Sequence, residues 1–171
     1  AYRRLWEHLV PGQDRERESD FESMKELMES STLPAEHLWE NLCEIRRLRV
    51  RGVPGSGKTG LLRALCRDAL SRGERPLYLS VTAPLARRMS NRLGPYADCR
   101  TLDDLVAEAG RRAGRDPTDS VTDGPSLLAA ALDDGVLRPW TTAAIDEAQS
   151  IPTPWWPVLE RFAGADGRLW I

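Results

Sequence analysis

The chain has 171 residues, a formal net charge of −2 and 41% hydrophobic residues. This length suits one domain with its own core, and the near-neutral charge gives no global sign of nucleic-acid binding. No apolar run approaches the ~20 residues of a membrane-spanning helix, and the N-terminus lacks the apolar core of a signal peptide. The 3 cysteines form no C-x-x-C or zinc pattern, which favours a reducing, cytoplasmic setting with no membrane partner.

The first 45 residues are predicted to form a helical extension. Apolar residues recur at helical spacing in three stretches, at about 2–10, 19–30 and 34–47. Prolines and glycines interrupt the pattern between the stretches. His8 and His37 lie here without any partner at metal-ligand spacing, so both are interpreted as structural or surface residues.

Strands and helices are predicted to alternate from residue 46 to residue 171. The predicted strands are 48–51, 76–81, 98–100, 141–145 and 169–171. The predicted helices are one that ends before Gly73 and four more at about 85–93, 101–113, 126–132 and 155–162, with an exposed loop at 114–125. This alternation predicts a doubly wound α/β domain with a mainly parallel sheet and helices on both faces. Ligands of such domains bind at the carboxyl ends of the strands.

The strongest motif is Gly52-Val53-Pro54-Gly55-Ser56-Gly57-Lys58-Thr59, between the first of these strands and the first of these helices. It has the form G-x-x-x-x-G-K-[ST], which is typical of a phosphate-binding P-loop. Glycines let backbone N–H groups approach phosphate oxygens, and the positive end of the helix faces the same anion. Lys58 can reach the β- and γ-phosphates, and the Thr59 hydroxyl can bind Mg²⁺. The alternative is a glycine-rich surface turn.

A second motif begins at the small apolar strand Ala143-Ala144-Ile145, which runs into Asp146-Glu147. A P-loop NTPase needs a carboxylate that holds Mg²⁺ and a group that orients or deprotonates the attacking water. Asp146 fits the first role and Glu147 fits the second. Other acidic pairs, such as Asp103-Asp104, do not end an apolar strand. The alternative is an exposed acidic turn.

These motifs resemble those of superfamily 1 DNA helicases of the UvrD/Rep type. Asp146-Glu147-Ala148-Gln149 is similar to their motif II, and Thr82 to Leu93 resembles motif Ia, T-x-x-x-A-x-x-M-x-x-R-[LV]. Thr101 to Leu105 occupies the place of their T-F-H-S-L motif, and the segment from Trp155 resembles the lead-in to motif III. The resemblance covers about Arg46 to Ile171.

The resemblance implies a P-loop ATPase of RecA-like fold, the first motor domain of a helicase or nuclease-helicase that acts on single-stranded DNA. Its cofactors would be ATP and Mg²⁺. By position, Lys58 would contact phosphate, Thr59 and Asp146 would hold Mg²⁺, Glu147 would be the base and Gln149 would sense the γ-phosphate.

The chain departs from this family near the expected DNA track. Ala83-Pro84 replaces the usual Asn-Lys, and Leu102-Asp103 replaces an aromatic residue and a histidine. Four arginines could compensate for the acidic residues or form a solvated face; they are Arg87, Arg88, Arg92 and Arg100.

The chain begins without Met and stops inside a predicted strand, before motif III. It is therefore expected to be a fragment whose partner, a second RecA-like domain, lies outside it, and which alone hydrolyses ATP weakly or not at all. The rival hypothesis is an AAA or signalling-type P-loop ATPase, in which nucleotide binding switches a protein interaction. A third is a degenerate, non-enzymatic scaffold, which the intact Lys58, Thr59, Asp146 and Glu147 argue against.

Overall fold

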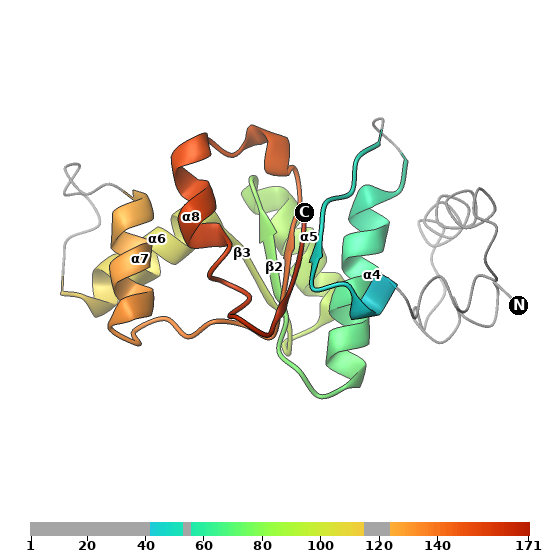
Figure 1. Ribbon diagram of the computed structural model, residues 1–171, viewed down its shortest axis with the longest axis horizontal. Helices are drawn as coiled ribbons and strands as arrows, with labels where there is room; N and C mark the ends of the chain where they lie inside the picture. Colours follow the sequence, from blue (N-terminus) through green and yellow to red (C-terminus); the bar gives the residue numbers. More distant parts are fainter. Residues whose placement is uncertain (1–41, 53–55, 115–123) are drawn as a thin grey trace, which may run out of the picture.

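A computed structural model describes residues 42–52, 56–114 and 124–171 (Figure 1). The helices predicted at about 2–10 and 19–30 lie outside these ranges. So do the first part of the third predicted helix, Val53, Pro54 and Gly55 of the glycine-rich motif, both histidines and most of the predicted loop at 114–125. Leu42 to Glu44 are helical, so the third predicted helix ends three residues earlier than expected. The chain is already extended at Arg47, where the first strand begins.

Five strands form one sheet in which every neighbouring pair is parallel. They are β1 (Arg47–Leu48), β2 (Leu77–Ser80), β3 (Asp98–Thr101), β4 (Thr142–Ile145) and β5 (Arg168–Trp170), in the order β1-β5-β4-β2-β3. The α/β class predicted from the alternation is confirmed. Each predicted strand is present within a few residues of its expected bounds. The Val50 N–H donates to the Ile171 carbonyl and the Ile171 N–H donates to the Leu48 carbonyl, so the β1–β5 pairing continues beyond the two assigned residues of β1.

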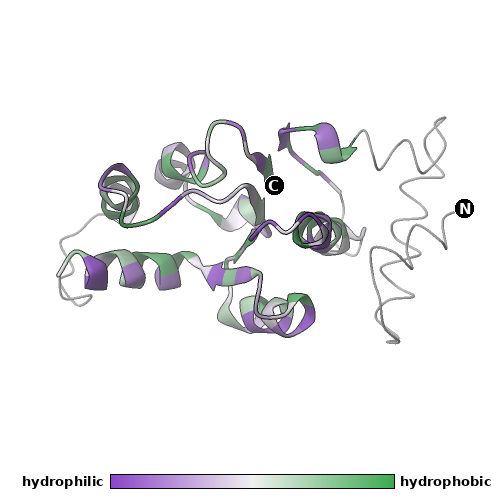
Figure 2. Cartoon of the chain, turned by 90° about the horizontal axis from the view of Figure 1, so that it is seen from below, coloured by the Kyte–Doolittle hydropathy of each residue, from purple (hydrophilic) through white to green (hydrophobic). Residues whose placement is uncertain are grey.

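Helices cover both faces of the sheet. They are α4 (Lys58–Ser71) and α5 (Ala83–Leu93) on one face, and α6 (Leu102–Arg112), α7 (Gly124–Asp133) and α8 (Trp156–Leu159) on the other. One core forms around Leu65, Tyr78 and Trp170, and the other around Leu105 and Phe162. In Figure 2 the helices turn their hydrophobic sides inward and their hydrophilic sides outward, as amphipathic packing requires.

The helix ends follow from local sequence. Helix α4 ends before Gly73, as predicted. Gly73 has a φ of 75°, and its N–H and that of Glu74 donate to the carbonyls of Leu70 and Ala69, which is a Schellman motif. Thr101 caps α6 as predicted, and Asp104 completes a capping box by accepting from the Thr101 N–H. Hydrogen bonds from Thr101 lower the pKa of the Asp104 carboxyl.

Three helix bounds differ from the sequence prediction. Helix α5 begins at Ala83, and α7 begins at Gly124 and so takes in the end of the predicted loop. The predicted helix 155–162 is the short α8 preceded by a 3₁₀ turn, Thr153–Trp155. Beyond α8 the N–H groups of Arg161 and Phe162 donate to carbonyls three residues back, so the backbone tightens into turns and the α-helix ends.

Candidate functional site

The glycine-rich motif leads from the carboxyl end of β1 into α4. Gly57, the N-cap of α4, has φ 85° and ψ 9°, a left-handed conformation that glycine adopts at little cost. The first turn of α4 contains no acidic residue, and no side chain caps its N–H groups in the described part of the chain. The N–H groups and the positive end of this 14-residue helix favour an anion.

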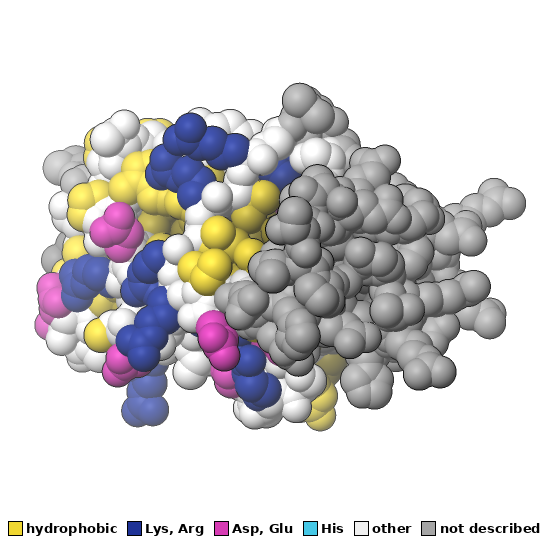
Figure 3. Space-filling view, turned by 45° about the vertical axis from the view of Figure 1, so that its right-hand side comes forward, with side chains coloured by type: hydrophobic (Ala, Val, Ile, Leu, Met, Phe, Trp, Pro, Cys, Tyr) yellow, Lys and Arg dark blue, Asp and Glu magenta, His cyan; other side chains and the backbone are white. Residues whose placement is uncertain are grey.

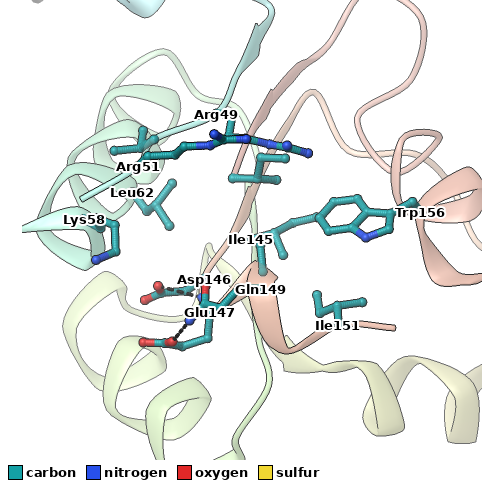
Figure 4. Close-up of a pocket in the computed structure, with 13 residues that line it drawn as sticks. Arg49, Arg51, Lys58, Leu62, Ile145, Asp146, Glu147, Gln149, Ile151 and Trp156 are labelled. Carbon is teal, nitrogen blue, oxygen red and sulfur yellow. Dashed lines mark hydrogen bonds between the residues drawn. The ribbon is translucent and has the colours of Figure 1, made fainter. Parts of the chain in front are cut away.

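Lys58 lies at the start of α4 and lines a pocket of about 350 Å³. Its Nζ donates a hydrogen bond of 2.9 Å to the carbonyl oxygen of Gly52, across the loop that joins β1 to α4. Asp146, Glu147 and Gln149 line the same pocket (Figure 4). The structure thus brings together one cation and two carboxylates that the sequence separates by almost ninety positions.

Asp146 follows the last residue of β4, a strand in which every residue is buried. Its own side chain is only 3% exposed. The Thr59 hydroxyl donates to Asp146 Oδ2 at 2.7 Å, and the Glu147 N–H donates to Oδ1 at 2.9 Å. The contact between Thr59 and Asp146 spans 87 positions of sequence. The two residues predicted to hold Mg²⁺ are therefore direct neighbours.

Glu147 has φ 55° and is the only non-glycine residue with a positive φ among the described residues. Such a conformation costs on the order of 1 kcal/mol or more for a residue with a side chain. Gln149, in the 3₁₀ turn Ala148–Ser150, donates from Nε2 to Glu147 Oε2 (Figure 4). Both side chains are exposed on the pocket. The structure therefore joins Gln149 to Glu147, while its expected contact with a γ-phosphate stays a prediction.

Tyr78 is a site residue that the sequence reasoning missed. It lies in the middle of β2 with no exposed surface, and its hydroxyl donates to Asp146 Oδ2 at 2.6 Å. Burial and the nearby Asp146 carboxylate raise the pKa of the phenol well above its usual range. The sequence holds only a faint signal, one polar-tipped aromatic in an apolar strand. Its meaning depends on β2 lying beside β4, which a single sequence does not reveal.

The far wall of the pocket is apolar and was also missed. Its lining includes Ile145, Ile151 and Trp156, with Arg49 and Arg51 at the rim on the β1 side (Figure 4). Trp156 comes from α8, so its place in the site depends on how α8 packs over the carboxyl edge of the sheet. A pocket with one charged and one apolar wall suits a ligand that has both an anionic part and an apolar part.

Several residues near Thr101, between the two motifs, have structural contacts. Thr101 and Asp104 form the capping box of α6, and Asp103 lies beside them as an exposed residue of the first turn. Arg100 pairs with Asp98 and with Glu108, which favours a structural role for this arginine.

Arg87 and Arg88 are exposed on α5. On the face seen in Figure 3, basic side chains lie among acidic and hydrophobic ones and do not merge into one basic surface. This face therefore gives no strong electrostatic signature of a nucleic-acid track.

The cysteines and the remaining acidic residues suggest no second chemical centre in the described ranges. Cys43, Cys66 and Cys99 are unpaired thiols, and burial is the main cause that raises the pKa of each, that of Cys99 to about 12. The described residues contain no cluster of three or more His, Cys, Asp or Glu side chains that could hold a metal ion. None of the described helices is long and apolar enough to cross a membrane.

Comparisons with known proteins found no matching family model, no matching curated protein and no matching solved structure. The function is therefore argued from the geometry of the pocket and from the motifs in the sequence.

Proposed function

We propose that this chain binds Mg²⁺·ATP and hydrolyses the nucleotide, as the P-loop NTPase domain of RecA-like fold that its motifs resemble. The observation that carries the proposal is the 2.7 Å hydrogen bond between Thr59 and Asp146. It joins the last residue of the glycine-rich motif to the first acidic residue of the second motif, beside a pocket that Lys58 and Glu147 also line. Two motifs that were identified separately in the sequence thus meet where a single ligand could contact both.

The donor set fits Mg²⁺ bound to a nucleotide. Mg²⁺ prefers hard oxygen ligands, usually one or two protein groups together with phosphate oxygens and water. Thr59 can keep donating its proton to Asp146 while a lone pair of its oxygen faces the ion, and Asp146 supplies negative charge beside it. When bound, Mg²⁺ neutralises charge on the β- and γ-phosphates.

The chain's own residues supply the remaining roles. The N–H groups at the start of α4 and the Lys58 ammonium bind phosphate oxygens. Glu147 accepts the proton of a water that attacks the γ-phosphorus, which releases ADP and inorganic phosphate. Its hydrogen bond from Gln149 orients the carboxylate toward the pocket.

The resemblance in sequence extends the proposal to a motor domain of the superfamily 1 helicase type that moves along single-stranded DNA. The rival hypothesis is a nucleotide switch that acts on a protein partner. It is favoured by the exposed Asp103, which stands where the helicase motif has a histidine near DNA, and by the pairing of Arg100 with Asp98 and Glu108.

The two hypotheses differ in their response to DNA. If the chain belongs to a motor, single-stranded DNA is expected to raise the Mg²⁺-dependent ATP turnover of the full-length protein severalfold. The stimulation should weaken with salt, because phosphate contacts release counterions. The measurement is phosphate release with and without a single-stranded oligonucleotide.

A charge reversal on α5 serves as the matched comparison. Arg87→Glu should reduce the stimulation by DNA while the DNA-free rate stays the same, and Arg138→Glu, on an exposed loop, should change neither. If single-stranded DNA does not change the rate of ATP turnover, the nucleotide switch that acts on a protein partner becomes the better proposal. A protein that neither binds nor hydrolyses ATP would refute both.

A further inference from the structure

Tyr78 is a buried polar group that the proposed mechanism does not use. Its side chain has no exposed surface and lies in the core beneath α4, with Cys66, Ala144 and Trp170 in the same cluster. Register places Tyr78 opposite Ala144 of β4, two residues before Asp146. The small Ala144 side chain lets the phenol lie along β4, so the hydroxyl reaches the carboxylate at the strand end.

The hydroxyl of Tyr78 has a specific partner. Burying a hydroxyl without a hydrogen bond is costly, and the 2.6 Å bond to Asp146 Oδ2 removes that cost. A phenylalanine would fill the same space without any polar group to satisfy. Packing alone therefore does not account for the hydroxyl at this position.

The Asp146 carboxylate is held from three sides. Oδ2 accepts from both Thr59 and Tyr78, and Oδ1 accepts from the Glu147 N–H. Thr59 belongs to the P-loop helix and is expected to face the nucleotide. Tyr78 is the donor that comes from the core, so it can hold Asp146 whether or not a ligand occupies the pocket.

We infer that Tyr78 is a positioning residue, which fixes the orientation of Asp146 and thereby sets the affinity of the site for Mg²⁺ with nucleotide. This inference rests on the proposed Mg²⁺·nucleotide site. Residues that orient a metal-binding carboxylate commonly change metal affinity by about 10–100-fold when they are replaced. The role differs from that proposed for Lys58 and Glu147, because Tyr78 is fully buried and acts through Asp146.

The test is the Mg²⁺ dependence of nucleotide binding by the full-length protein. Tyr78→Phe is expected to raise the Mg²⁺ concentration that gives half-maximal tightening of ADP binding by about tenfold. Nucleotide affinity in EDTA should remain at the wild-type value, because no phosphate contact is lost. Tyr96→Phe is the matched control, since Tyr96 is 76% exposed and does not line the pocket of Lys58 and Asp146. It should leave both quantities unchanged.

A double-mutant cycle separates positioning from a general loss of stability. In an Asp146→Ala background, which leaves no side-chain oxygen to accept the Tyr78 hydroxyl, Tyr78→Phe should have no further effect on the Mg²⁺ dependence, because its influence passes through the carboxylate. An additive effect in that background, or an unchanged Mg²⁺ dependence in a folded Tyr78→Phe protein, would overturn the inference. A wild-type protein that binds no nucleotide would instead refute the proposed function.

Discussion

Replacing Glu147 with glutamine is expected to lower the ATP turnover number of the full-length protein by at least about a hundredfold, the usual contribution of a general base. Glutamine has nearly the same shape and can still accept the hydrogen bond from Gln149 Nε2, but it cannot take a proton from water. Nucleotide affinity should stay within about threefold of the wild-type value, a change of less than 1 kcal/mol. Single-turnover hydrolysis and equilibrium titration with ATP measure the two quantities.

Glu160→Gln is the control for this variant. Glu160 is exposed just after α8 and does not line the pocket of Lys58 and Asp146, so its replacement should leave turnover unchanged. Undiminished hydrolysis in the Glu147→Gln protein would remove Glu147 from the role of base. A parallel loss of binding and turnover would mean that Glu147 shapes the pocket and does not activate water.

Replacing Lys58 with alanine is expected to weaken ATP binding at least about thirtyfold, or ~2 kcal/mol, because a hydrogen-bonding ammonium is removed from the phosphates. Stability should change little. The hydrogen bond from Lys58 to the Gly52 carbonyl is exposed, and the side chain is not part of either core. Calorimetric titration with ATP and a denaturant unfolding curve provide the two measurements.

Arg138→Ala removes an exposed cation outside the pocket and should leave ATP affinity unchanged. This control separates the specific effect of removing Lys58 from the pocket from the general effect of removing one positive charge. Wild-type affinity in the Lys58→Ala protein would contradict the assignment of the glycine-rich motif as a phosphate-binding loop.

Much of the fold could be predicted from local sequence. Glycine stop signals, alternating apolar strands and the Thr101 cap act over a few residues, and the described ends of α4, α5 and α6 fall within two residues of expectation. The predicted extent of the 155–162 helix was wrong, because the α-helix ends at Leu159 and the backbone then forms turns with hydrogen bonds three residues apart. In this segment the spacing of apolar residues favours a helix, but tertiary packing and turn formation favour a different backbone conformation.

The candidate site was predictable where its residues belong to a contiguous motif. The sequence predicts that Thr59 and Asp146 hold the same Mg²⁺ ion, because each motif implies a chemical role that requires the other motif. Tyr78 and Trp156 were not predicted, because no motif contains them. Tyr78 reaches Asp146 because β2 lies next to β4, and Trp156 reaches the pocket because of the way α8 packs. Strand order and helix packing are properties of the whole fold, and local sequence patterns do not specify them.

The most direct test of the account is the effect of Mg²⁺ on nucleotide affinity in the wild type and in Thr59→Val. Valine keeps the β-branched shape in α4 but removes the hydroxyl that contacts Asp146, and Thr153→Val, on an exposed turn, is the control. We predict that Mg²⁺ tightens ATP binding by the wild type and by Thr153→Val, relative to EDTA, and that this tightening is lost in Thr59→Val. Equal wild-type affinities in Mg²⁺ and in EDTA, or full tightening in Thr59→Val, would contradict a magnesium–nucleotide site at Thr59 and Asp146.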